Sequence, residues 1–130
     1  MKQRLAQPDQ VLTRLSQLAN LNADHNYGRT FSTDSLRVFL GNCLTYHVFI
    51  EACEVIGCVS VRQDGELGAV IDPQNTVRAY RLMTDYVGTL NIPLWSKVQT
   101  SNTSVWKRLV RLGFKVVSQN RTDTVLRREA

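Results

Sequence analysis

The side chains that most often bind metals are few and scattered in this chain of 130 residues. Its cysteines, Cys43, Cys53 and Cys58, are odd in number and lack C-x-x-C spacing, so we expect reduced thiols in a cytosolic compartment. His25 and His47 lie far apart in the sequence, and each is expected to have a structural or surface role. The sequence therefore predicts no metal site.

The clearest pattern, at residues 94–117, predicts a strand, a helix and a second strand. Apolar and polar residues alternate over residues 94–100, as in a half-buried strand. The helix can be capped by Asn102, Thr103 or Ser104, because a short polar side chain accepts hydrogen bonds from the free N–H groups of a first turn. Apolar residues then recur at helical spacing, at Val105, Trp106, Leu109 and Leu112. Gly113 suits a left-handed helix end, and an extended apolar run follows.

This segment resembles the C-terminal half of the GCN5-related N-acetyltransferase (GNAT) superfamily, which commonly reads N-x-x-A-x-x-x-Y-x-K-x-G-F. The positions that correspond are Asn102, Val105, Arg111, Gly113 and Phe114. Leu109 stands where the family has its Tyr.

The rest of the chain supplies elements in the order β-α-α-β-β-β-α-β-α-β-β, which is that of the GNAT fold. The expected elements before residue 94 are a strand at 1–6, helices at 8–21 and 33–40, strands at 43–52, 55–62 and 66–71, and a helix at 76–90. Tight turns join the three strands, so they should be antiparallel. The last strand, 124–128, should pair with 115–118. We predict an α/β (α+β) GNAT-like domain spanning 1–130, with a mixed central sheet of about six or seven strands and about four helices.

Two of these helices have a clear apolar face. In the first, the residues expected to point inward are Val11, Leu12, Leu15, Leu18 and Leu21. In the helix at 76–90, they are Val77, Tyr80, Met83, Val87 and Leu90.

The resemblance implies that acetyl-coenzyme A lies between strands 66–71 and 94–100. It also places the pyrophosphate on the following helix N-terminus, where the family has Q/R-x-x-G-x-G/A. One alignment puts Gln74, Val77 and Ala79 on this motif, and another, shifted alignment loses both glycines. Val77 adds bulk where the backbone should be bare. Arg78 and Arg81 can compensate by pairing with phosphates, or can simply be solvated.

Acetyl transfer from a thioester to an amine needs a base, an oxyanion donor and an acid. By the resemblance, the main chain near Val70 and Ile71 is the expected oxyanion donor. Glu66 is the candidate base, with an exposed carboxylate beside a turn as the alternative. Ser104 is a candidate acid, because Leu109 cannot donate a proton. Asn102 is either a cofactor contact or a plain helix cap.

Three functions remain open from the sequence. The first is an acetyl-CoA-dependent N-acetyltransferase acting on a small-molecule or protein amine. The second is a non-enzymatic GNAT scaffold. Asn102-Thr103-Ser104 with Leu109 is similar to the acetyltransferase-like small internal virion proteins of short-tailed bacteriophages. This similarity implies other virion proteins as partners, and a location in the host cytoplasm or the virion. The third is a basic nucleic-acid-binding domain, which the scattered Lys and Arg behind the net charge of +5 do not favour. No membrane partner is expected, since no apolar run is long enough to span a bilayer.

Overall fold

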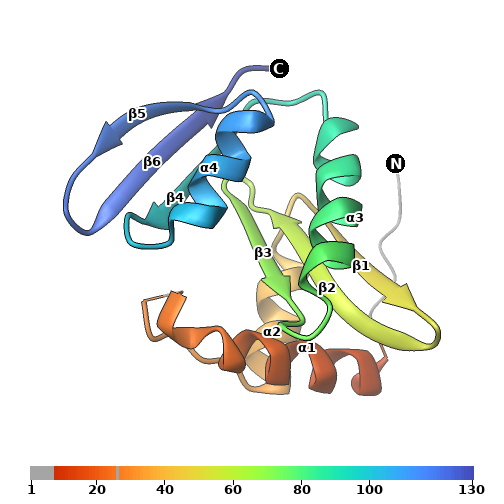
Figure 1. The fold of residues 1–130 in the computed structure, drawn as a ribbon. Coiled ribbons are helices and arrows are strands. Elements are labelled where there is room, and N and C mark those ends of the chain that lie inside the picture. Colours follow the sequence, from red (N-terminus) through yellow and green to blue (C-terminus); the bar gives the residue numbers. More distant parts are fainter. Residues whose placement is uncertain (1–7, 26) are drawn as a thin grey trace.

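The computed structural model describes residues 8–25 and 27–130, so the strand expected at 1–6 lies outside the described residues. Six strands form two antiparallel sheets of three, coloured yellow-green and blue in Figure 1. The first sheet has the order β1-β2-β3, from Thr45–Glu51, Glu54–Val61 and Leu67–Ile71. The second has the order β4-β6-β5, from Leu94–Gln99, Asp123–Arg128 and Lys115–Gln119. The predicted α/β class, hairpins and final strand pairing are confirmed.

Among the described residues, one parallel bridge between Glu66 and Trp95 joins the two antiparallel sheets, in keeping with the mixed sheet that the sequence predicted. The turn that precedes this bridge has Gly65 at a φ of +91°. A side chain there would be strained and would also lie 3.0 Å from the Pro93 carbonyl oxygen. Gly65 thus allows the two sheets to approach each other at this one point.

The helices divide between the two faces of the first sheet. Helices α1 (Asp9–Leu21) and α2 (Thr33–Gly41) share a core with Val55 and Cys58 of β2. Helix α3 (Thr76–Gly88) packs on the other face, in a core that contains Val59 and Val61, while α4 (Thr103–Arg111) lies against the second sheet (Figure 1). The neighbours Cys58 and Val59 of β2 therefore face opposite layers. Val55 lies on the same side as Cys58 because the pairing of β1 with β2 shifts register between Phe49 and Ile50.

Two helix-face predictions are wrong. The side chain of Leu21 is 67% exposed and that of Val77 is 75% exposed. Both lie at a helix end, where an apolar residue can extend beyond the packed layer. Two alanines, Ala19 and Ala79, take buried positions instead, and their small size makes them inconspicuous in a hydrophobic pattern.

The helix caps agree with the sequence in part. Ser32 caps α2: its hydroxyl accepts from the Ser35 N–H, and the Ser35 hydroxyl accepts in return from the Ser32 N–H. Asn102 occupies the N-cap position of α4, but its side chain makes no capping hydrogen bond. Gly113 follows α4 with a φ of +93°, as a left-handed helix end requires.

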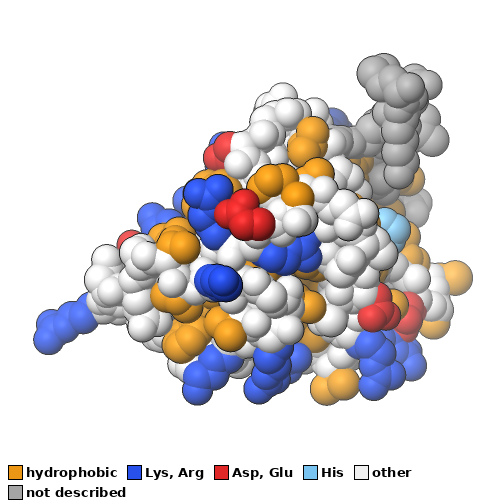
Figure 2. Space-filling model, turned by 90° about the horizontal axis from the view of Figure 1, so that it is seen from above, with side chains coloured by type: hydrophobic (Ala, Val, Ile, Leu, Met, Phe, Trp, Pro, Cys, Tyr) orange, Lys and Arg blue, Asp and Glu red, His pale blue; other side chains and the backbone are white. Residues whose placement is uncertain are grey.

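The surface charge is mixed. Figure 2 shows Lys and Arg side chains spread over the face in view, with acidic and apolar side chains between them. In the part of the chain that the structure describes, no helix combines the length and apolar character that a membrane span needs.

Candidate functional site

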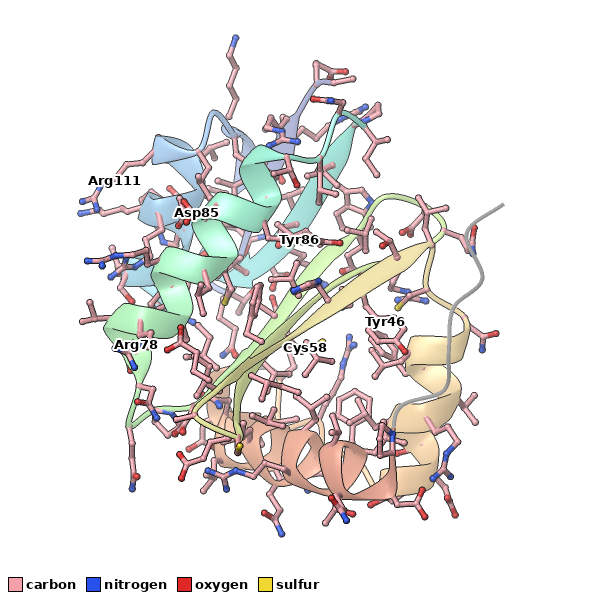
Figure 3. The ribbon with its side chains drawn as sticks, turned by 90° about the vertical axis from the view of Figure 1, so that its right-hand side faces the viewer. Tyr46, Cys58, Arg78, Asp85, Tyr86 and Arg111 are labelled. Carbon is pink, nitrogen blue, oxygen red and sulfur yellow. The ribbon has the colours of Figure 1, made fainter. Side chains whose placement is uncertain are left out.

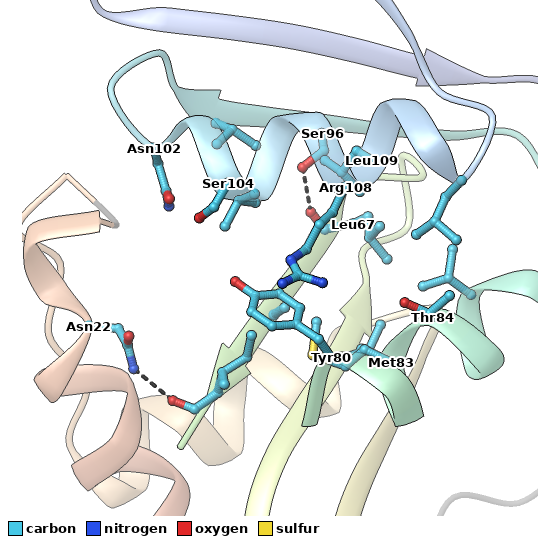
Figure 4. Close-up of a pocket in the computed structure, with 18 of the residues that line it drawn as sticks. Asn22, Leu67, Tyr80, Met83, Thr84, Ser96, Asn102, Ser104, Arg108 and Leu109 are labelled. Atoms are coloured by element: carbon cyan, nitrogen blue, oxygen red, sulfur yellow. Dashed lines mark hydrogen bonds between the residues drawn. The ribbon is translucent and has the colours of Figure 1, made fainter. Parts of the chain in front are cut away.

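Strands β3 and β4 separate immediately after their bridge. The Trp95 N–H donates to the Gly65 carbonyl (3.1 Å), and the Ser96 hydroxyl donates to the buried Leu67 carbonyl (3.1 Å). Beyond this point a cavity of about 350 Å³ opens between the strands, with α3 and α4 as its other walls (Figure 4). The strands diverge here as the resemblance implied.

The backbone of β3 presents alternate peptide groups to this cavity. The Asp72 N–H donates to the Ile56 carbonyl of β2 (2.8 Å), so the peptide groups of Val70, two residues earlier, also face β2. The peptide groups of Ala69 and Ile71 must therefore point away from β2. In agreement, the Asn22 side-chain amide donates a hydrogen bond to the Ile71 carbonyl from that open side (2.9 Å). The open edge therefore offers the N–H groups of Ala69 and Ile71. Of the two residues proposed as oxyanion donors, only Ile71 is oriented to serve.

The loop before α3 contains an acidic residue that organises it. The Asp72 carboxylate is buried and accepts from the Gln74 N–H (2.9 Å) and the Asn75 side-chain amide (2.9 Å). These hydrogen bonds hold the pKa of Asp72 below its usual value, with a smaller contribution from Arg14. The Gln74 N–H is thus engaged inside the loop. The next N–H groups, at 76–78, lie in the first helical turn, where no helix carbonyl can accept from them.

The residues proposed for cofactor binding on α3 mostly face away from the cavity. Ala79 is fully buried beside Gly57, while Val77, Arg78 and Arg81 are exposed and outside the cavity lining. Arg78 pairs with Glu51 at the end of β1 (Nε to Oε1, 2.9 Å) and lies at the outer start of α3 in Figure 3. The reason is helical periodicity: the residues that line the cavity are Thr76, Tyr80, Met83, Thr84 and Val87. The bulk of Val77 therefore does not obstruct the site.

On α4, two proposed site residues do reach the cavity, and so does a third that sequence reasoning missed. Asn102 and Ser104 line it near the start of the helix (Figure 4). The Arg108 guanidinium crosses from α4 to lie over the ring of Tyr80, 4.1 Å from its centroid. Burial raises the pKa of Tyr80, and the positive charge of Arg108 opposes that rise. Leu109, at the family's Tyr position, contributes only an apolar wall.

The proposed base lies elsewhere. Glu66 lines a smaller cavity on the α1–α2 side of β3 and pairs with Arg62 (3.1 Å). It is not among the residues that line the larger cavity, where Ser104 lies. The two proposed catalytic side chains therefore reach β3 from opposite faces.

The cysteines and histidines form no competing site among the described residues. No group of three or more His, Cys, Asp or Glu side chains within 8–25 and 27–130 is arranged to hold a metal ion. Cys43 and Cys58 are buried thiols, and burial raises the pKa of Cys58 to about 12, so it is not a nucleophile at neutral pH.

Comparison by sequence finds no matching family model and no matching curated protein. Solved structures do match over nearly the whole chain. A GNAT-family acetyltransferase from Bacillus anthracis superposes with a TM-score of 0.66 at 10% identity, covering 95% of this chain and 91% of that one. A Salmonella typhimurium protein with its cofactor acetyl-CoA gives 0.69 at 17%, covering 96% and 91%. A spermidine N-acetyltransferase variant from Vibrio cholerae gives 0.65 at 18%, covering 95% and 90%. The chain has the fold of the GNAT acetyltransferases.

Proposed function

We propose that this protein is an acetyl-CoA-dependent N-acetyltransferase. The observation that carries the proposal is the open edge of β3, whose Ala69 and Ile71 N–H groups face the cavity between α3 and α4. A backbone donor held in a strand is preorganised for the negative charge that develops on an acyl oxygen during transfer. The neighbours' description as acetyltransferases, one of them with acetyl-CoA, supports the same reaction.

The reaction joins an amine to an acetyl group. Acetyl-coenzyme A would supply a thioester whose carbonyl carbon is electrophilic. The amine nitrogen forms a C–N bond with that carbon while the C–S bond breaks; the nitrogen loses one proton and the sulfur gains one. Glu66, which lines the cavity on the α1–α2 side of β3, would receive the proton from an amine approaching that face. One of the two open N–H groups, that of Ala69 or that of Ile71, would hold the oxyanion, because donors two residues apart on a strand are too distant to share one oxygen.

The proton for the sulfur has two candidate donors in the larger cavity. Ser104 lines the cavity from α4, and Tyr80 lines it from α3. The Arg108 guanidinium, which suits the phosphates, lies against the Tyr80 ring. The sulfur and the phosphates are at opposite ends of the pantetheine arm of coenzyme A, so Ser104 is the better replacement for the hydroxyl that Leu109 lacks.

The cavity also contains a cation suited to the phosphates. Arg78 is paired with Glu51 on the outer side, whereas Arg108 projects into the cavity toward Tyr80. Guanidinium groups bind phosphate through paired charge-assisted hydrogen bonds. We therefore assign the main phosphate contact to Arg108, supported by the free N–H groups at residues 76–78.

A calorimetric titration with acetyl-CoA tests the proposal. The wild type should bind, and Arg108→Gln should weaken binding about tenfold because one charge-assisted contact is lost. The matched control Arg78→Gln, on α3 and outside the cavity lining, should bind within about twofold of the wild type. Release of free thiol with an amine acceptor then reports turnover, and Tyr80→Phe and Ser104→Ala identify the proton donor.

Two outcomes would contradict the proposal in different ways. An equal loss in both arginine variants would place the cofactor outside the α3–α4 cavity. Folded protein that gives no heat with millimolar acetyl-CoA would instead support the non-enzymatic scaffold. Two observations favour that alternative: Leu109 is apolar, and the Gln74 N–H already donates to the Asp72 carboxylate.

A further inference from the structure

The smaller cavity, of about 130 Å³, lies between the first sheet and the helices α1 and α2. Its apolar wall consists of Leu15, Phe31, Leu36, Phe39, Leu40 and Cys58. Its volume is about four times the ~30 Å³ that one water molecule occupies in the liquid, which suits a small ligand.

This cavity and the larger one meet at the gap between β3 and β4. Four residues line both: Leu67, Gly68, Ala69 and Lys97. Gly68 keeps the floor of the smaller cavity low, since a Cβ there would lie 3.2 Å from the Ser60 hydroxyl, which also lines it. A ligand in the smaller cavity can therefore bring a reactive group to the open edge of β3 from the side opposite α3 and α4.

The polar wall of the smaller cavity is mainly basic. Arg29, Arg62 and Lys97 contribute cations, and Glu66 is the one carboxylate among the lining residues. Arg62 is already paired with Glu66. Lys97 lies 3.9 Å from Asp123, an acid outside the lining.

Arg29 differs from these two cations. None of the ion pairs found among the described residues involves Arg29. Its side chain comes from the exposed loop between α1 and α2 and lines the cavity. The cavity lining therefore has a positive charge without an ion-pair partner, at Arg29, and one carboxylate, at Glu66.

We propose that the smaller cavity binds a small primary amine that also carries an anionic group, a carboxylate or a phosphonate. The anionic group lies against Arg29, and the amine lies near Glu66, Gly68 and Ala69. A polycation would instead meet three basic side chains and one acid. The assignment names the acceptor class for the acetyl transfer proposed above and rests on that function for its catalytic role.

Titration of the ¹⁵N-labelled protein, without acetyl-CoA, measures this binding directly. The probes are β-alanine and 2-aminoethylphosphonate, compared with the uncharged amide of β-alanine and with spermidine. The two anionic amines should shift the Gly68 and Ala69 amide signals saturably, and the other two should not. Binding should weaken as salt is added, because the contact at Arg29 is exposed.

Arg29→Gln should weaken β-alanine binding about tenfold. Arg111→Gln removes the same charge from an exposed position at the end of α4, pointing outward in Figure 3, and should leave binding unchanged. The amide spectrum of each variant also checks that it is folded. Equal binding of the uncharged amide, tighter binding of spermidine, or no effect of Arg29→Gln would overturn the assignment.

The acetyl-CoA titration separates this inference from the proposed function. If acetyl-CoA binds and no anionic amine does, the acceptor class is wrong and the transferase proposal stands. If the anionic amines bind and acetyl-CoA does not, the binding site stands and the transfer reaction fails.

Discussion

The first sheet is covered on both faces, and the second on only one. Every residue from Val55 to Val61 of β2 is buried, between α1 and α2 on one side and α3 on the other. In contrast, β5 is exposed along its whole length, with Val116 at 42% and Val117 at 55% exposure. The second sheet packs mainly through the α4 side, where Leu126 and Phe114 are buried.

This difference explains where the candidate site lies. The first sheet is a framework held by two cores, and β3 is its edge. The second sheet attaches at the Glu66–Trp95 bridge and then diverges, so the remaining β3 edge is left without a neighbouring strand. A strand edge with unpaired N–H groups is a ready binding element, provided that its position is rigid.

The largest expected difference is in packing energy. Val59→Ala in β2 should lower the free energy of unfolding by about 2 kcal/mol, from two lost carbons at ~0.8 kcal/mol each plus a residual cavity. The same change at Val117 in β5 should cost less than about 0.5 kcal/mol. Urea denaturation measures the free energy of unfolding of both variants. Because both carry the same Val→Ala change, the difference in intrinsic strand preference between Val and Ala cancels when the two losses are compared. Similar losses at the two positions would refute the unequal covering of the sheets.

The next effect concerns the junction. Ser96→Ala removes the hydroxyl that donates to the buried Leu67 carbonyl and should cost about 1–2 kcal/mol, because that carbonyl loses its partner. Ser118→Ala, at an exposed position in β5, is the matched control and should be near neutral. If Ser96→Ala is as stable as the control, the hydrogen bond does not fix where β3 and β4 separate.

The smallest effect concerns a second link between the regions. The Tyr27 hydroxyl, from the loop after α1, donates to Asp123 of β6. Burial, with this hydrogen bond, raises the pKa of Tyr27 to about 12. Tyr27→Phe should therefore cost no more than about 1 kcal/mol at neutral pH, because the contact is partly exposed.

The pH dependence gives this link its own signature. The unfolded Tyr27 loses its proton near pH 10 and the folded one near 12, so the stabilisation is complete below about pH 10 and is lost as the pH rises to 12. Denaturation at pH 9 and 11 should show a steeper loss for the wild type than for Tyr27→Phe. Equal losses would show that Tyr27 titrates normally.

Much of the fold follows from local sequence. Helical and alternating patterns located the α-helices and strands that the structure describes, and Gly113 marked the end of α4. The sequence could not reveal that Leu21 and Val77 lie outside the core, because a pattern shows which face is apolar but not where the packed layer ends.

The site was predictable as a region but not in its contacts. Asn102 and Ser104 both line the cavity, and β3 and β4 separate as the resemblance implied. The sequence did not predict three contacts: that of Arg108 with Tyr80, the hydrogen bonds of Asp72 within its own loop, and the ion pair of Arg78 with Glu51. Each depends on how distant elements are oriented, or on which hydrogen bonds a loop makes once it folds.

The sequence by itself determined the order and type of the elements, because the spacing of apolar residues and the backbone preferences of turn residues act locally. Only the tertiary structure decided which β3 N–H groups remain open and which arginine enters which cavity. Those outcomes depend on the register between β2 and β3, the single bridge to β4 and the rotation of α3 and α4, which arise from packing between residues far apart in the chain.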